Sequence, residues 1–227
     1  VSATLGANLF VTRLTGHGRN GPAMAEAMIG DWSDDLTEAL AIGERLGERV
    51  VVVGNSTGAA LATVAALQPD GAERMAGLVA IAPNYRILDP RNVILTLPFA
   101  RSLIARFGPA EFGTPSDNPR VNEHWTTRYP SSALLPMARL AEVARNADVR
   151  AVRVPAFFVY APGDRVVDAR EIERVASEWG APHRTLTVGD SGDANQHVLA
   201  GDIVSPQTTT RLADEISAWV RDLPAAR

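Results

Sequence analysis

The stretch Val50–Leu61 reads VVVVGNSTGAAL and contains the most informative motif of the chain. Four valines precede the motif Gly-Asn-Ser-Thr-Gly at Gly54–Gly58, and a run rich in alanine follows it. Valine favours strands because its branched side chain packs well on a pleated sheet, whereas alanine favours helices. The stretch therefore predicts a sharp turn from a strand into a helix, with Ser56 between two glycines.

The motif matches the pattern Gly-x-Ser-x-Gly, in which a strained turn lifts the serine Oγ above a sheet. Small residues on both sides of the serine, here Gly54 and Gly58, relieve the crowding in such a turn. The helix N-terminus then offers backbone N–H groups, among them that of Thr57, to a developing oxyanion. The pattern also arises by chance in glycine-rich turns with a bystander serine. The strand before it and the helix after it favour a nucleophilic Ser56.

A nucleophilic serine needs a base, and the base needs an orienting acid. In the α/β-hydrolase arrangement these residues follow in the order serine, acid, histidine. Asp164 comes soon after the apolar run Pro155–Tyr160, at the strand end where open α/β sheets place their sites. Asp168 is the alternative acid, although it also suits the cap of a helix that starts at Ala169. We favour Asp164 because it lies nearer the end of the strand.

His197 is the expected base, because it lies in the loop after the last predicted strand and downstream of both acid candidates. His17 lies in a glycine-rich turn well before the serine, and His124 lies in a segment without predicted strands. His183 begins a strand, which favours a structural role. A histidine in a loop is often only solvated, but the position of His197 in the chain order favours catalysis.

Strands and helices alternate along most of the chain. Strands are expected at Asn8–Leu14, Val50–Val53, Gly77–Ala82, Pro155–Tyr160 and His183–Val188, and helices at Asp31–Glu48, Thr57–Leu67, Ala169–Trp179 and Thr208–Val220. This alternation predicts an α/β fold with a mostly parallel sheet flanked by helices. The uniformly apolar run of valines is typical of a parallel strand covered on both faces.

Residues 86–150 break this alternation, because their helical pieces have no strands between them. We expect a helical lid here, inserted into a hydrolase-like core formed by residues 1–85 and 151–227. The apolar side chains of the insertion, Phe99 and Trp125 among them, are candidates to bind an apolar substrate together with Asn55 beside the nucleophile. Alternatively, the apolar residues of the insertion only pack it onto the core.

Composition excludes several functions. The formal net charge of the 227 residues is −4, and no basic run stands out, so we expect no nucleic acid partner. The chain has no cysteine, which excludes disulfides, thiolate metal sites and a cysteine nucleophile. No apolar run approaches the roughly 20 residues of a membrane-spanning helix. We expect no stable membrane insertion, and neither a metal nor an organic cofactor.

The first ten residues, VSATLGANLF, do not look like a signal peptide. This favours the cytoplasm, although the chain need not begin at its natural start. The sequence does not indicate an oligomeric state.

Taken together, these motifs resemble the α/β-hydrolase superfamily, and within it the monoacylglycerol-lipase-like enzymes and small bacterial carboxylesterases. The resemblance covers nearly the whole chain and rests on five segments: LGANLFVTRLTGHG (5–18), DWSDDLTEAL (31–40), VVVVGNSTGAALA (50–62), VPAFFVYAPGDRVVD (154–168) and NQHVL (195–199). It implies a serine hydrolase that cleaves an acyl ester or a monoacylglycerol-like lipid through a Ser56–His197–Asp164 triad and an acyl-enzyme. The Thr57 N–H would donate a hydrogen bond to the oxyanion.

The chain departs from this family pattern in two places. Ala59 stands where the family usually has another glycine, which is a small change. The family also has an earlier strand that ends in a His-Gly loop and supplies the first oxyanion donor, and no such segment precedes Leu5. We therefore expect that the N-terminal strands are missing from this chain and that an apolar edge of the sheet is exposed.

Two alternatives remain at the level of the sequence. The same fold and triad also support amidases, peptidases, thioesterases and carbon–carbon bond hydrolases. A haloalkane dehalogenase is disfavoured, because its nucleophile position would hold aspartate instead of Ser56. From a different class, the chain would be a non-catalytic scaffold that binds an apolar ligand.

Overall fold

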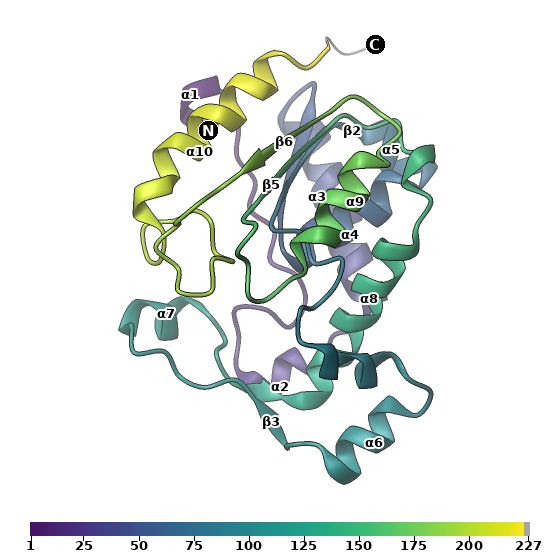
Figure 1. The fold of residues 1–227 in the computed structure, drawn as a ribbon. Helices are drawn as coiled ribbons and strands as arrows, with labels where there is room; N and C mark the ends of the chain where they lie inside the picture. Colours follow the sequence, from purple (N-terminus) through teal and green to yellow (C-terminus); the bar gives the residue numbers. More distant parts are fainter. Residues whose placement is uncertain (225–227) are drawn as a thin grey trace.

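Four parallel strands form the main sheet of the computed structural model, which describes residues 1–224 (Figure 1). The strands are β1 (Val50–Asn55), β2 (Met75–Ile81), β5 (Ala156–Tyr160) and β6 (His183–Thr187), in the spatial order β1-β2-β5-β6. Every neighbouring pair is parallel, as the alternation of strands and helices predicts. The predicted α/β fold with a mostly parallel sheet is confirmed.

Helices fill most of the rest of the chain. The α-helices are α1 (Ser2–Leu5), α2 (Gly21–Met24), α3 (Ile29–Leu46), α4 (Thr57–Ala66), α5 (Pro69–Arg74), α6 (Ala100–Phe107), α7 (Pro119–His124), α8 (Leu134–Asn146), α9 (Ala169–Ser177) and α10 (Pro206–Arg221). Three short 3₁₀ helices are η1 (Pro90–Thr96), η2 (Ser131–Ala133) and η3 (Val149–Ala151), and β3 (Glu111–Phe112) pairs with β4 (Tyr129–Pro130). None of the helices within residues 1–224 is both long and apolar enough to span a bilayer.

The sheet buries both of its faces. Because successive side chains of a strand point to opposite faces, Leu78 and Phe158 join one apolar cluster, which also contains residues of α3, α4, α8 and α9. Val79 and Phe157 join a second cluster on the other face, where the Trp219 ring of α10 lies 5.7 Å from the Phe157 ring. Burial on both faces explains why β2 and β5 read as continuous apolar runs.

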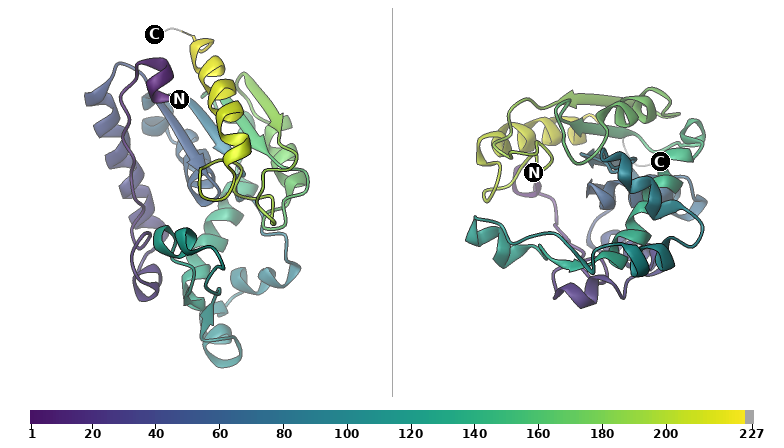
Figure 2. Two further views of the ribbon diagram at one scale, coloured as in Figure 1. Left: turned by 90° about the vertical axis from the view of Figure 1, so that its left-hand side faces the viewer. Right: turned by 60° about the horizontal axis from the view of Figure 1, so that its bottom comes forward.

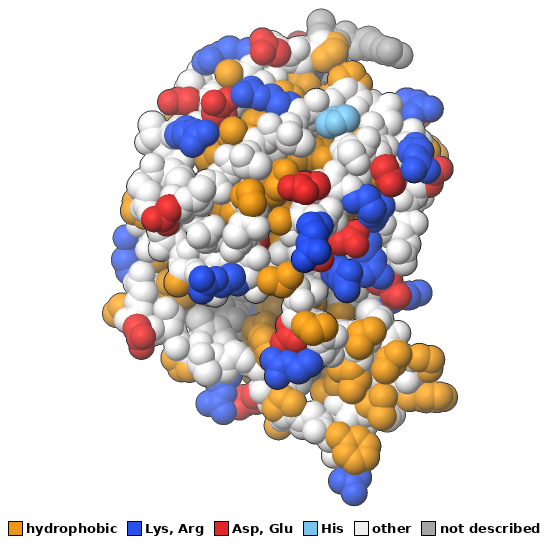
Figure 3. Space-filling model, in the orientation of Figure 1, with side chains coloured by type: hydrophobic (Ala, Val, Ile, Leu, Met, Phe, Trp, Pro, Cys, Tyr) orange, Lys and Arg blue, Asp and Glu red, His pale blue; other side chains and the backbone are white. Residues whose placement is uncertain are grey.

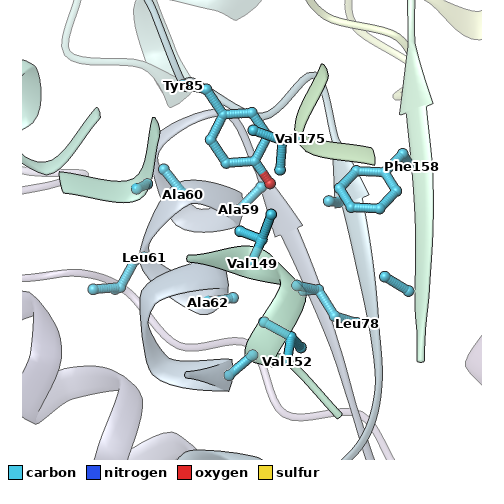
Figure 4. Close-up of a cluster of buried hydrophobic side chains, with 14 of the residues drawn as sticks. Ala59, Ala60, Leu61, Ala62, Leu78, Tyr85, Val149, Val152, Phe158 and Val175 are labelled. Carbon is cyan, nitrogen blue, oxygen red and sulfur yellow. The ribbon is translucent and has the colours of Figure 1, made fainter. Parts of the chain in front are cut away.

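The alanine-rich helix α4 packs closely on the first of these faces (Figure 4). Ala59, Ala60 and Ala62 are buried, and their small side chains let the helix backbone approach the sheet. The Tyr85 hydroxyl points toward this helix and forms a hydrogen bond of 2.8 Å with the Thr63 hydroxyl. Burial raises the pKa of Tyr85, so the phenol stays protonated in this bond.

The strand predicted for Asn8–Leu14 is wrong, because these residues form no ladder with any described strand. The segment runs alongside α3 (Figure 2, left), where the Asn8 amide donates to the Leu46 carbonyl at 2.5 Å and the Thr15 N–H donates to Asp35 at 2.5 Å. A strand needs a neighbour about 4.8 Å away, and a groove separates this segment from β1 instead. The apolar pattern is thus present, but it has no strand to pair with.

The segment between β2 and β5 contains helices and the short β3–β4 pair. Its last helix, α8, packs against α4, and Leu140 and Ala144 lie in the main apolar cluster. Its earlier part is more exposed, and Figure 3 shows apolar side chains gathered over η1 and α6. Ile94 of η1, Leu97 just after it and Phe107 of α6 are all exposed.

Candidate active site

Ser56 lies at the turn from β1 into α4, with backbone angles φ 50° and ψ −112°. A residue with a side chain rarely adopts a positive φ, so the turn is strained as its sequence predicts. Two backbone hydrogen bonds hold it to the end of β2. The Ser56 N–H donates to the Ile81 carbonyl at 2.9 Å, and the Asn84 N–H donates to the Ser56 carbonyl at 3.1 Å.

The two glycines of the motif have different surroundings. A Cβ on Gly54 would lie 2.7 Å from Ala59 Cα and 2.8 Å from Ala59 N, so no side chain fits there. A Cβ on Gly58 would have no atom of the described residues within 4 Å, apart from its chain neighbours and the backbone of its own helix, and its φ is not positive. The crowding expected on both sides of the serine therefore exists only at Gly54.

Asp164 lies in the loop after β5 and its side chain is fully buried. Its Oδ1 accepts hydrogen bonds from the Val166 N–H at 2.7 Å and the Val167 N–H at 2.9 Å. Its Oδ2 lies 2.8 Å from Nδ1 of His197. Both carboxylate oxygens therefore have partners, which offsets the cost of burying the charge.

Asp168, the alternative acid, has another role in the structure. It is the N-cap of α9, and its carboxylate accepts a hydrogen bond from the Arg170 N–H at 3.1 Å. This is the helix cap that its position before Ala169 suggests.

His197 lies between the serine and the acid. Its Nε2 is 3.0 Å from Ser56 Oγ, its Nδ1 faces Asp164, and its side chain is 13% exposed. With its Nδ1 proton held by a carboxylate, an imidazole can accept the serine proton at Nε2. The structure thus brings together the three residues that chain order singles out, and it gives them a geometry suited to proton transfer.

Asp193, which sequence reasoning missed, holds the turn that carries His197. Its Oδ2 accepts from the N–H groups of His197 and Val198, both at 2.9 Å, and its Oδ1 accepts from the Asn195 N–H at 3.1 Å. The loop is also joined to the acid loop, because the Arg165 N–H donates to the Asn195 carbonyl at 2.9 Å. An aspartate four residues before the predicted base was the available signal, since Asp side chains commonly cap backbone N–H groups nearby.

Asn84 is a second polar residue that sequence reasoning missed. It is buried just past the end of β2, and its Nδ2 lies 3.0 Å from Met137 Sδ. Its Oδ1 is buried with no hydrogen-bond partner within residues 1–224. A polar residue just beyond a buried parallel strand could have drawn notice, because that edge of the sheet carries the sites in open α/β folds.

The other candidate residues are not gathered in one pocket. Thr57 is the first residue of α4, so its N–H has no acceptor within the helix. Asn55 is the last residue of β1 and is exposed. Phe99 is 83% exposed at the start of α6, and Trp125 is exposed after α7. The structure therefore places Thr57 and Asn55 next to Ser56 in the chain and leaves Phe99 and Trp125 at the surface.

Two of the three remaining histidines contact neighbouring groups of the fold. The His17 ring packs edge-on against Trp32 at 5.7 Å, and His183 Nδ1 lies 3.2 Å from the Ala181 carbonyl oxygen. His124 ends the short helix α7. Within residues 1–224, no group of three or more histidine, aspartate or glutamate side chains is arranged to hold a metal ion.

Comparison with known families found one match over most of the chain. A model of the family described as "Serine aminopeptidase, S33" matches residues 3–192. A comparison with curated proteins found no match.

Several solved structures have similar folds. One, reported with the metagenome-derived lipolytic enzymes LipS and LipT, is 25% identical and has a TM-score of 0.72, over 92% of this chain and 80% of that chain. A soluble variant of monoglyceride lipase from Saccharomyces cerevisiae is 10% identical with a TM-score of 0.71, over 94% and 76% of the two chains. The monoacylglycerol lipase of Paleococcus ferrophilus is 16% identical with a TM-score of 0.65, over 92% and 81%.

Proposed function

Since this chain belongs to the hydrolase family described as serine aminopeptidase, S33, we propose that it cleaves carboxylic esters with apolar acyl groups through an acyl-enzyme on Ser56. The observation that carries the proposal is the continuous contact from Ser56 Oγ to His197 Nε2 at 3.0 Å and from His197 Nδ1 to Asp164 Oδ2 at 2.8 Å. The similar structures include a monoglyceride lipase and a protein reported with lipolytic enzymes, and this likeness supports an ester as the substrate.

In this mechanism Ser56 Oγ attacks the acyl carbonyl carbon, and His197 Nε2 takes the serine proton. The tetrahedral intermediate then expels the alcohol, which leaves with the proton from His197. A water molecule attacks the acyl-enzyme next, with His197 again as the base, and the carboxylic acid departs. Asp164 keeps the imidazole in the required tautomer and stabilises its charged form.

The oxyanion would accept a hydrogen bond from the Thr57 N–H at the N-terminus of α4. This group is one of the helix N–H groups that have no partner within the helix, and the helix dipole adds positive partial charge there. A donor placed in this way acts on the charge that develops in the transition state, which is where it lowers the barrier.

We also propose that residues 86–150 form the lid over this site and supply its apolar contacts. Exposed apolar side chains over η1 and α6 support this assignment, because such side chains suit an apolar acyl group. Phe99 and Trp125 are the contacts proposed within the lid, and Asn55 is the contact proposed beside the nucleophile. The substrate would be a small apolar ester, such as a monoacylglycerol-like lipid.

The first prediction tests the nucleophile with a fluorophosphonate probe, followed by peptide mass spectrometry. We expect an adduct on Ser56 in the unaltered chain, and none in Ser56→Ala or His197→Ala. Ester hydrolysis should fall by about 10⁴–10⁶-fold in both variants, because the triad acts as a unit. Circular dichroism of both variants is the folding control. Hydrolysis near the unaltered rate in Ser56→Ala would refute the assignment.

The family description favours amide hydrolysis as a second candidate function. Short-chain and long-chain p-nitrophenyl esters, a thioester and an aminoacyl anilide, assayed side by side, separate the reactions. We expect the highest kcat/KM on an ester. A higher value on the anilide would instead assign the chain as an aminopeptidase, with the same residues in the same roles.

A further inference from the structure

Two contacts join the loop of Asp164 to the loop of His197, besides the hydrogen bond between their side chains. One, described above, begins at the Arg165 N–H. In the other, the Gln196 carboxamide fills the space beside Gly163. A Cβ added to this glycine would lie 2.5 Å from Oε1 and 3.2 Å from Cδ of Gln196. The acid and the base thus each have a chain neighbour that touches the other loop.

Gln196 has a backbone conformation that its residue type disfavours. Its φ is 51°, in the left-handed region that glycine and asparagine enter most easily. Its N–H donates to the Asp193 carbonyl at 2.9 Å, so this conformation closes a tight turn directly before His197. Glycine would form such a turn at a lower cost in strain. The presence of glutamine therefore points to its side chain rather than to the turn.

The same contact accounts for glycine at position 163. The φ of Gly163 is not positive, so its backbone does not require glycine. The place of its Cβ is instead taken by the Gln196 carboxamide. The two residues together bring a long polar side chain against the backbone next to Asp164, and neither residue type is dictated by its own backbone.

The triad needs a fixed spacing between these two loops. The Asp164 side chain is fully buried and the His197 side chain is 13% exposed, so a loosened bond would leave a buried charge without its partner. Ordering the glutamine side chain costs rotamer entropy. Backbone strain of this kind persists only where surrounding contacts over-determine it, and it gathers at active sites. A contact that keeps His197 Nδ1 at Asp164 Oδ2 offsets both costs.

From these observations we propose that Gln196 is a positioning residue, which holds His197 in place through its contact with Gly163. The inference rests on the hydrolysis proposed above, because it gives Gln196 a part in that reaction. Gln196 acts through His197 and needs no contact with the substrate. Without the carboxamide, the imidazole would also adopt orientations in which Nε2 leaves Ser56 Oγ or Nδ1 leaves Asp164 Oδ2. Turnover would then slow while substrate binding stays the same.

The test is a double-mutant cycle between the two residues, read by steady-state kinetics on one p-nitrophenyl ester. Gln196→Gly removes the carboxamide, and Gly163→Ala displaces it. We expect each change to lower kcat about tenfold and to leave KM within about twofold, since a small misplacement of a catalytic group is costly. Either change already breaks the contact. The double variant should therefore be no slower than the single variants, instead of about a hundredfold slower than the unaltered chain.

Unfolding in urea separates this role from a structural one. Gln196→Gly relieves the positive φ, which offsets the lost contact, so its urea midpoint should not fall. A purely structural role does not lower kcat without a loss of stability. Gln207→Ala is the matched control, because the Gln207 carboxamide packs on Gly192 in the same loop, and Gly192 is next to neither the acid nor the base in the chain. Its kcat should stay within about twofold.

The Nδ1 proton of His197 gives a readout that needs no substrate. Its hydrogen bond to Asp164 should place this proton far downfield in the NMR spectrum of the unaltered chain, and the missing signal in His197→Ala assigns it. In Gln196→Gly and Gly163→Ala the signal should broaden through exchange with water.

Three results would each overturn the proposal: an unchanged kcat in Gln196→Gly, additive losses in the double variant, or an equal loss in Gln207→Ala. A chain that shows the Nδ1 signal and its broadening but cleaves no ester would refute the proposed hydrolysis alone. The effect of Gln196 on His197 would stand in that case, so the two failures are distinguishable.

Discussion

At the residue scale, the two glycines around Ser56 differ in what their positions allow. Gly54→Ala would press its Cβ against the backbone of Ala59 at 2.7–2.8 Å. We expect this variant to lose about 1–3 kcal/mol of unfolding free energy, the usual cost of overpacking. Gly58→Ala has free space and lies inside a helix, so it should gain about 0.5–1 kcal/mol. Urea unfolding of the two variants measures the contrast, and equal stabilities would contradict it.

The two aspartates after β5 give a second residue-scale prediction. Asp164→Asn removes the carboxylate beside His197 Nδ1, which favours the wrong tautomer, and we expect kcat to fall by about 10⁴-fold. Asp168→Asn keeps the cap of α9, because asparagine caps a helix as well as aspartate does. Its kcat should stay within a few-fold of the unaltered chain. Steady-state kinetics on one ester decides between them, and a larger loss in Asp168→Asn would reverse the assignment.

At the element scale, the loop between β6 and α10 depends on Asp193. Asp193→Ala would free three N–H groups, including that of His197, so the base would lose its fixed position. A displacement of about 1 Å can cost about 10²-fold in rate, and we expect a loss of about 10–10²-fold in kcat with KM little changed. The control is Asp190→Ala, since exposed Asp190 caps the Gly192 N–H and makes no bond to the N–H of His197. Comparable losses in both variants would show that the loop, rather than Asp193, is responsible.

The elements themselves show what a sequence pattern can and cannot predict. Apolar runs identify β1, β2, β5 and β6, and each lies within two residues of its predicted bounds. The same kind of pattern at Asn8–Leu14 predicts a strand that does not form, because the pattern describes side chains and not the neighbour that a ladder requires. The exposed edge at β1 was expected from the resemblance to α/β-hydrolases and not from the valines, which indicate a covered strand.

At the scale of the whole molecule, the order of elements along the chain predicts a parallel sheet and a triad in the order serine, acid, histidine. Ser56, Asp164 and His197 could be singled out because their side chains have the chemistry of a triad and because each follows the end of a predicted strand. Asp193 and Asn84 carry only a weaker signal, their position shortly before the predicted base and just past a buried strand, and the backbone groups beside them take their places only in the finished fold.

The separation of Ser56 from His197 along the chain, 141 residues, has a consequence for folding kinetics. Contacts between distant residues form late, since closing a long loop costs entropy before any contact repays it. During refolding from urea we expect the far-ultraviolet circular dichroism of the helices to return first and reactivity of Ser56 toward a fluorophosphonate to return last. Stopped-flow dichroism and quenched labelling of the same samples give the two time courses. Coincident time courses would mean instead that the sheet and the reactive centre form in a single cooperative step.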